Sequence, residues 1–116
     1  MTSEELFQID KKISENGDVV IVSFSFFENF DDINRVDTLM FASISEDVGR
    51  YEGYQVEMDD TKGQFFAYGR NAEELFKVMR PILLQFDFLR TAMVYLHFNN
   101  EDGSQSELEF SLKDVS

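Results

Sequence analysis

The residues that could perform catalysis are few and widely spaced. His97 is the only histidine and cysteine is absent, which excludes a mechanism with two imidazoles, most histidine-based zinc sites and any thiolate nucleophile. Four serines, Ser23, Ser25, Ser43 and Ser45, fall outside the G-x-S-x-G and S-x-x-K arrangements that activate a hydroxyl. The six glycines are scattered, so no glycine-rich phosphate loop is present. We therefore expect no catalytic residue, and we expect that the protein is not an enzyme.

Calcium ligation would need an acidic loop with a defined spacing of ligands. The acidic loops of the chain are "FNNEDGSQSELE" and "EMDDTKGQ". An EF-hand loop has an invariant glycine at its sixth position and an oxygen ligand at its first. Counting back from Gly103 or from Gly63 places Phe98 or Met58 at the first position, and neither side chain supplies that ligand. We expect no bound metal and no other cofactor.

What remains is a mixture of acidic and aromatic residues between Phe27 and Tyr54. Protein interfaces concentrate aromatic residues at their centre and charged residues at their rim, where the charges steer the partner. The predicted partner-binding residues are Glu28, Phe30, Asp31, Asp32, Glu46, Asp47, Tyr51, Glu52 and Tyr54. An alternative is that Tyr51 and Tyr54 only cap the edge of a sheet, and the sequence does not separate these two interpretations.

The charge of the chain is strongly negative and unevenly distributed. The formal net charge is -13 with only 10 basic residues, which argues against binding to nucleic acid or to an anionic membrane, because Lys and Arg drive both. Residues 1–60 hold 15 acids and 4 bases, a net of -11, and residues 61–116 hold 8 acids and 6 bases, a net of -2. Such an excess of acids either keeps copies of the protein apart in solution or steers a basic protein partner.

Length and composition predict one folded domain, residues 1–116. A chain of 116 residues can bury one core but is short for two, and its 13 Phe and 4 Tyr favour half-buried sheet surfaces. The start, "MTSEELFQIDKK", has no apolar segment behind a basic one, and no apolar run is long enough to span a bilayer. We expect a soluble, cytoplasmic protein.

The first segment of the chain allows two structures. As a helix, Thr2 to Glu5 would form a capping box, with Leu6, Ile9 and Ile13 on one face. As a hairpin, Asn16-Gly17 is the preferred pair for a two-residue turn, and Ile13 would then lie opposite Val20. We favour the hairpin. In either case the run "VVIVSFSFF" from Val19 to Phe27 is apolar on one face throughout, which predicts a central, covered strand.

The rest of the chain predicts strands on both sides of a helix. Residues 28–37 read as a loop or a short turn of helix, residues 38–46 and 53–59 as strands, and "DTKG" as a turn into the strand "QFFAYG". After Gly69 the spacing of apolar residues becomes helical from Asn71 to Phe86, and Pro81 should kink or divide that helix. The last strands are "TAMVYLHFN", with His97 as a strand-face residue, and "SELEFSL". The predicted fold is α+β, a two-layer sandwich in which a mainly antiparallel sheet of about six to seven strands is covered by one long, Pro-kinked helix.

The segment from Gly53 to Phe98, "GYQVEMDDTKGQFFAYGRNAEELFKVMRPILLQFDFLRTAMVYLHF", resembles small acidic bacterial immunity proteins of polymorphic and contact-dependent toxin systems. The shared features are a strand ending in "YG", a helix opening "NAEELF" with Pro81 near its end, and the strand "FLRTAMVYLHF". The resemblance covers less than half of the chain and carries over no binding residue. It implies a cytoplasmic protein that binds and neutralises one cognate toxin, often a basic nuclease, without performing catalysis.

Three functions are compatible with the sequence. The first is a protein-binding module that neutralises a basic partner, a toxin domain and possibly a nuclease, as an immunity protein would. The second is a small-ligand-binding or uncharacterised enzymatic domain, in which Pro81 and the aromatic-rich sheet shape a cavity. The third is a structural subunit. We favour the first because the acidic and aromatic residues share one half of the chain.

Overall fold

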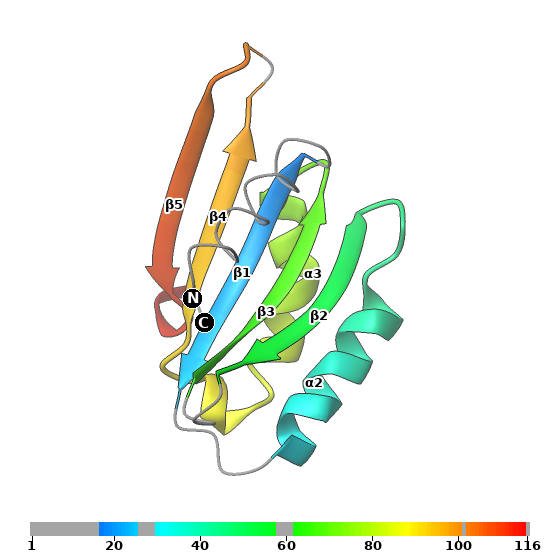
Figure 1. The fold of residues 1–116 in the computed structure, drawn as a ribbon, viewed down its shortest axis with the longest axis vertical. Helices are drawn as coiled ribbons and strands as arrows, with labels where there is room; N and C mark the ends of the chain where they lie inside the picture. Colours follow the sequence, from blue (N-terminus) through cyan, green and yellow to red (C-terminus); the bar gives the residue numbers. More distant parts are fainter. Residues whose placement is uncertain (1–16, 26–29, 58–61, 101, 116) are drawn as a thin grey trace.

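Within the residues that the computed structural model describes, 17–25, 30–57, 62–100 and 102–115, the chain folds into a five-stranded antiparallel sheet and two α-helices on one of its faces (Figure 1). The strands are β1 (Asp18–Ser25), β2 (Gly49–Val56), β3 (Lys62–Gly69), β4 (Met93–Asn99) and β5 (Gln105–Ser111). The helices are α2 (Phe30–Ser43) and α3 (Ala72–Leu83), with 3-10 turns η1 (Asp87–Leu89) and η2 (Leu112–Val115). The strand order is β2-β3-β1-β4-β5, and every neighbouring pair is antiparallel.

The strand β1 is the centre of the sheet. It pairs with β3 along one edge and with β4 along the other, and its first five residues are buried. The prediction of a central, covered strand is therefore confirmed. The first strand of the predicted hairpin lies outside the described residues. Among the described ones, Val20 pairs with Ala67 on one side and with Leu96 on the other.

The helix α2 corrects the prediction for residues 28–46. A loop or a short turn of helix followed by a strand was expected there, and the structure has 14 residues of α-helix from Phe30. The buried residues Ile33, Val36 and Met40 follow one another at intervals of three and four, and Ile44 continues the row just after the helix. These intervals place all of them on one helical face. Burying that face outweighs the short alternation of apolar residues between 38 and 46 that predicted a strand.

The helix α3 begins as predicted but ends earlier. The side chain of Asn71 accepts a hydrogen bond from the backbone amide of Glu74 at 3.0 Å, which is the expected N-terminal cap. The helix passes through Pro81 without being divided and ends at Leu83, after 12 residues. Phe86 belongs to the connection into η1 and is buried there. The single long helix that we expected from Asn71 to Phe86 is therefore the shorter α3, and α2 is a second helix that was not predicted.

The strand count is also corrected. Six to seven strands were expected, and the described residues form five, because residues 38–46 are mostly helical and the first strand of the predicted hairpin lies outside the described residues. The hairpins β2–β3 and β4–β5 are both present, although β2 begins at Gly49 and not at Gly53. His97 lies in β4 as predicted and is only 5% exposed.

The core lies between the sheet and the helices. The helix α3 packs against β1, β3 and β4, and α2 packs beside β2 and against α3 (Figure 1). The opposite face of the sheet carries a smaller apolar cluster of Val19 and Ile21 with Phe66, Tyr68 and Tyr95. In the described part of the chain, neither helix has the length and apolar character that a bilayer crossing requires.

Candidate functional site

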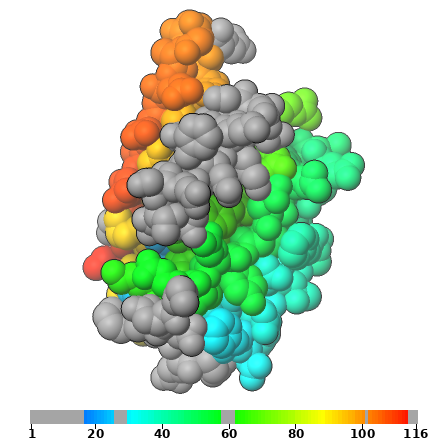
Figure 2. Space-filling model, viewed as in Figure 1, coloured from blue at the N-terminus to red at the C-terminus, as the bar shows by residue number. Residues whose placement is uncertain are grey.

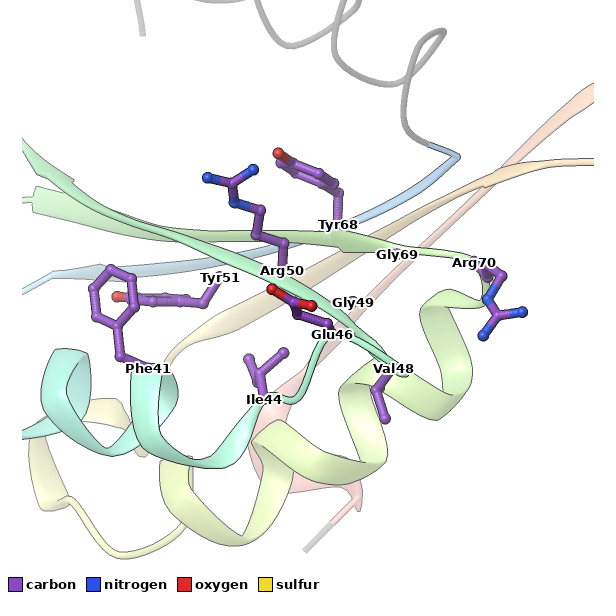
Figure 3. Close-up of a pocket in the computed structure, with 10 residues that line it drawn as sticks. All are labelled: Phe41, Ile44, Glu46, Val48, Gly49, Arg50, Tyr51, Tyr68, Gly69 and Arg70. Carbon is purple, nitrogen blue, oxygen red and sulfur yellow. The ribbon is translucent and has the colours of Figure 1, made fainter.

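A groove opens where α2 ends and β2 begins, at the edge of the sheet (Figure 3). Its volume is about 570 Å³. Its walls include Phe41, Ile44, Glu46, Arg50, Tyr51 and Tyr68. Because Glu46 and Tyr51 were predicted as partner-binding residues, this groove is where the structure brings part of the predicted site together.

A tight turn and a pair of glycines shape one end of the groove. The carbonyl oxygen of Ser45 accepts hydrogen bonds from the amides of Val48 and Gly49, both at 3.0 Å, so the chain reverses directly into β2. Gly49 then pairs with Gly69 of β3. A Cβ atom on Gly49 would lie 2.4 Å from the carbonyl oxygen of Tyr68, and one on Gly69 would lie 2.4 Å from that of Val48. Only residues without side chains allow β2 and β3 to approach this closely.

An aromatic pair forms the helix side of the groove. Tyr51 is 4% exposed, and its hydroxyl donates a hydrogen bond to Oδ1 of Asp37 in α2 at 2.8 Å. The ring of Phe41 stands edge-on to the ring of Tyr51, with centroids 4.7 Å apart and planes at 84°, yet Phe41 is 59% exposed. A buried tyrosine thus supports an exposed phenylalanine through an edge-on contact, which is a favoured geometry of an aromatic pair.

The environment of Tyr51 suppresses its ionisation. Burial of the ring, reinforced by the hydrogen bond to Asp37 and by the charge of that carboxylate, raises the pKa of Tyr51 well above its ordinary value. The phenol therefore keeps its proton and donates a hydrogen bond to Asp37 throughout the physiological range. Tyr51 acts as a fixed support for Phe41 and offers no group for proton transfer.

The other side of the groove is polar. Figure 3 shows Arg50 and Tyr68 projecting from the opposite face of the sheet to Phe41 and Tyr51. The hydroxyl of Tyr68 bonds the carboxylate of Glu52, which raises the pKa of Tyr68, while the nearby Arg50 partly offsets this shift. The groove therefore wraps around the edge of the sheet, with aromatic rings on one face and a cluster of charged and phenolic groups on the other.

A β-bulge interrupts β2 beside this groove. The pairing with β3 shifts between Tyr51 and Gly53, which leaves Glu52 as the extra residue, and Gly53 has a φ of +109° that favours glycine. A bulge twists the strand and breaks the regular row of hydrogen-bonding groups along its outer edge. This edge of the sheet is therefore poorly suited to pairing with another strand.

The structure separates the other predicted residues. Tyr54 donates a hydrogen bond to Oδ1 of Asn34 in α2 at 3.1 Å, so the two predicted tyrosines both fasten β2 to α2. These contacts match the alternative in which Tyr51 and Tyr54 cap the edge of the sheet. Asp47 is exposed on the turn, and its carbonyl oxygen accepts a hydrogen bond from Arg70 at 3.2 Å.

The remaining acids lie at the other end of α2. Asp31 and Asp32 line a second, more open groove of about 940 Å³ that also includes Gln85. Asp32 forms an ion pair with Arg35 at 3.8 Å, between two largely exposed side chains, which contributes little stability. Phe30 is exposed at the start of the helix, and Glu28 lies outside the described residues. Along the axis of α2, about 16 Å separates Phe30 from Phe41.

Phe41 and Arg50 are among the groove residues that the sequence did not predict. Phe41 was assigned to a strand, and its exposure follows only once α2 is recognised, because it lies off the face that Ile33, Val36 and Met40 bury. The spacing of those residues was the signal that could have revealed it. Arg50 was missed because its place beside Tyr68 depends on the pairing of β2 with β3.

The groove has the chemistry of a binding surface. Among the residues that the structure describes, no three histidine, aspartate or glutamate side chains are grouped closely enough to hold a metal ion. His97 lies elsewhere, on β4, where its Nδ1 is 3.2 Å from the Tyr95 hydroxyl and 3.7 Å from Glu107. Exposed aromatic surface surrounded by charges suits contact with another molecule and not proton transfer.

Comparison of the chain with models of protein families, with curated proteins and with solved structures found no match. The geometry of the groove and the charge of the chain are therefore the basis for assigning a function.

Proposed function

We propose that this protein is a non-catalytic, cytoplasmic binding module that neutralises a basic partner protein, as an immunity protein neutralises its toxin. The contact surface is the exposed side of α2 together with the turn into β2. The observation that carries this proposal is the position of Phe41, whose ring is 59% exposed and is held edge-on against the buried Tyr51.

A held, exposed aromatic ring is well suited to be an interface anchor. Binding hot spots are enriched in residues that bury a large apolar area, and an anchor whose orientation is already fixed loses little conformational freedom on binding. The hydrogen bond between Tyr51 and Asp37 fixes the support beneath the ring of Phe41. Large exposed apolar side chains lie at both ends of α2, at Phe30 and at Phe41. The exposed residues between them, Asp31, Asn34, Arg35 and Thr38, are polar or charged, so this helix offers an aromatic side chain at each end of a polar surface.

The acids around this surface favour a basic partner. Glu46 and Asp47 are exposed on the turn after α2, and Asp31 is exposed at its start. The half of the chain that contains α2 and β2 carries a net charge of -11. Exposed charges of one sign raise the rate at which an oppositely charged partner arrives and suppress wrong partners. Figure 2 shows α2 along one border of the molecule, away from the β4–β5 hairpin.

The test begins with capture of the partner. Wild-type protein and the variants Phe41→Ala and Leu84→Ala are immobilised in equal amounts and exposed at low salt to a lysate of the source organism. Captured proteins are identified by mass spectrometry. Leu84 is a matched control because it is also a large exposed side chain, 45% exposed, at the C-terminal end of α3. We expect wild type and Leu84→Ala to retain the same basic protein, and Phe41→Ala to lose most of it.

Binding kinetics with the purified partner then distinguish the role of the anchor, Phe41, from that of the charged rim, Glu46 and Asp47. We expect Phe41→Ala to weaken binding by about 2 kcal/mol or more, mainly through faster dissociation. The double variant Glu46→Lys/Asp47→Lys should instead slow association and weaken its dependence on salt. Neutralisation is measured as loss of the partner's activity at equimolar protein. Equal binding by wild type and Phe41→Ala, or binding without neutralisation, would contradict the proposal.

A further inference from the structure

The edges of the sheet differ in how they are protected against pairing. At one edge, the bulge at Glu52 interrupts β2, and α2 packs beside this strand. At the other edge, β5 keeps a continuous register with β4, from Met93 opposite Ser111 to Asn99 opposite Gln105. No bulge or proline interrupts β5, and none of the described residues pairs with its outer edge. Natural edge strands are protected by bulges, prolines or charged side chains. Of these, β5 has only charged side chains, at Glu107 and Glu109, so its seven residues can still pair with a strand of the opposite charge.

Hydrogen bonds at the ends of the β4–β5 pair identify which backbone groups of β5 are free. The amide of Leu112 donates to the carbonyl of Ala92, and the amide of Asn100 donates to the carbonyl of Ser104, both at 2.9 Å. Both pairs continue the register of β4 with β5. In an antiparallel ladder, hydrogen-bonded and non-hydrogen-bonded pairs alternate. Within β5, the residues Ser106, Leu108 and Phe110 therefore direct their N–H and C=O groups at β4.

The residues between these direct their backbone groups outward. By this count the outward residues are Gln105, Glu107, Glu109 and Ser111. The side chains of Glu107 and Glu109 are exposed and share the face of their β4 partners, His97 and Tyr95. The side chain of Leu108 points to the other face and is 50% exposed. The open edge thus offers hydrogen-bonding groups at two glutamates that flank an exposed leucine.

A second copy of this chain is a poor occupant of this edge. Antiparallel pairing of β5 with itself must place outward residues opposite outward residues. If the pairing is centred on Leu108, Glu107 lies opposite Glu109 twice. If it is centred on either glutamate, that residue lies opposite its own copy. Registers centred on Ser106 or Phe110 avoid these contacts but pair only three residues of each β5. Directly opposed like charges destabilise a strand pair, and two chains of net charge -13 also repel each other.

We propose that β5 is a docking edge for an extended segment of a basic protein, which adds to the sheet as an antiparallel strand. The incoming strand has Lys or Arg opposite Glu107 and Glu109 and an apolar residue opposite Leu108. Main-chain hydrogen bonds to the free groups of β5 supply affinity, and the alternating side chains supply selectivity. In Figure 2 the β4–β5 hairpin stands at the border of the molecule away from α2, so this surface is separate from the one proposed above.

The test uses a fluorescein-labelled peptide of eight residues in which Lys and Val alternate, measured by fluorescence anisotropy. In the proposed register the lysine amides face β5 and the valine amides face solvent. Peptides with N-methyl groups on the lysine amides should bind at least about tenfold more weakly, because each methyl removes a donor to β5. N-methylation of the valine amides should leave binding almost unchanged. Equal effects of the two modifications, or no saturable binding, would overturn the proposal.

Charge variants of the protein provide the second arm. Glu109→Lys should weaken binding of the unmodified peptide by about fivefold, because one opposed pair changes from attractive to repulsive. Glu73→Lys is the matched control, since Glu73 is exposed on α3 and equally changes the net charge. Equal loss in both variants would mean that the peptide responds only to overall charge. Sedimentation of the protein alone should show a monomer, and a dimer disrupted by Glu109→Pro, which removes an outward N–H of β5, would identify a second copy as the occupant instead. Phe41→Ala should leave peptide binding unchanged, so this result is independent of the α2 surface.

Discussion

The carboxylate of Asp18 accepts a hydrogen bond from the backbone amide of Ala72 at 3.0 Å, across a separation of 54 residues. Its other oxygen accepts one from the amide of Asn99 at 2.8 Å, and the side chain of Asn99 donates to the carbonyl of Gly17. Asp18 is 5% exposed. One buried side chain therefore ties the start of β1 to the first turn of α3 and to the end of β4, and a carboxylate is well placed at a helix N-terminus.

Replacing Asp18 should destabilise the whole domain. Asp18→Asn keeps the shape of the side chain but turns one acceptor into a donor that faces a backbone N–H. We expect the free energy of unfolding to fall by about 2 to 3 kcal/mol, the range for a buried hydrogen-bonding group left without its partner. Urea denaturation followed by circular dichroism measures this loss. Asp87→Asn, at an exposed carboxylate, is the control and should change stability by under about 0.5 kcal/mol.

The buried phenol of Tyr51 predicts a loss of stability at alkaline pH. Its pKa is raised by burial and by Asp37 from 10.0, so the folded protein keeps the proton above pH 10 while the unfolded chain releases it. The stabilisation is complete below pH 10 and is lost as the pH rises further, by up to about 1.4 kcal/mol per pH unit. When the pH rises from 9 to 11, the free energy of unfolding should fall by about 1.4 kcal/mol less in Tyr51→Phe than in wild type. Identical losses in the two proteins would show that Tyr51 ionises freely in the folded state.

Truncation of Phe41 and truncation of Tyr51 should lower the free energy of unfolding by different amounts. Tyr51→Ala removes a buried ring that packs in the core and is expected to lower the free energy of unfolding by about 3 to 5 kcal/mol. Phe41→Ala removes a largely exposed ring and should lower it by under about 1 kcal/mol. Thermal unfolding of both variants tests this difference. A large loss in Phe41→Ala would mean that this ring is needed for folding, which would weaken its assignment as an interface anchor.

The glycine pair at the end of the groove predicts a backbone clash. A Cβ atom at Gly69 would lie 2.4 Å from the carbonyl oxygen of Val48 and 2.9 Å from the Cα of Gly49. These are backbone atoms, so Gly69→Ala forces β2 and β3 apart at this end, at a cost of about 1 to 3 kcal/mol. Amide hydrogen exchange should show the faster opening at Gly49 and Arg50 and little change in β4 and β5. Uniformly faster exchange in all five strands would contradict a local effect.

Elements with one consistent local signal could be predicted from the sequence. Both faces of β1 are largely apolar, and α3 combines the cap Asn71 with a row of buried residues, so each was placed close to its observed position. The helix α2 has weaker signals. Its buried row is interrupted by polar residues, and Leu39 and Phe41 add an alternation that favours a strand. Packing against α3 and β2, which the sequence does not display, decides between the two structures.

The site was harder to predict because its geometry depends on long-range pairing. The acids on the turn after α2 were identified from composition, and the structure places Glu46 in the groove. Exposure of Phe41 and burial of Tyr51 depend on where α2 lies against β2. The sequence left Tyr51 either as a partner-binding residue or as a cap on the edge of the sheet, and the structure shows it buried, against Phe41 and hydrogen-bonded to Asp37. No local pattern indicates that Asp18 meets Ala72 and Asn99.

Because β1 is the central strand, both of the strands that pair with it are synthesised after it. Val20 pairs with Ala67 and Leu96, 47 residues (20 to 67) and 76 residues (20 to 96) further along. At about 5 to 20 residues per second, a ribosome needs roughly 4 to 15 s to reach the second of these partners. The apolar run from Val19 to Phe24 has neither neighbouring strand until β3 is made and still lacks β4 for the rest of that interval, and such a window is prone to aggregation. The yield of folded protein in a cell therefore depends on how soon the last strands follow the first, and a pause in translation before residue 93 should lower it.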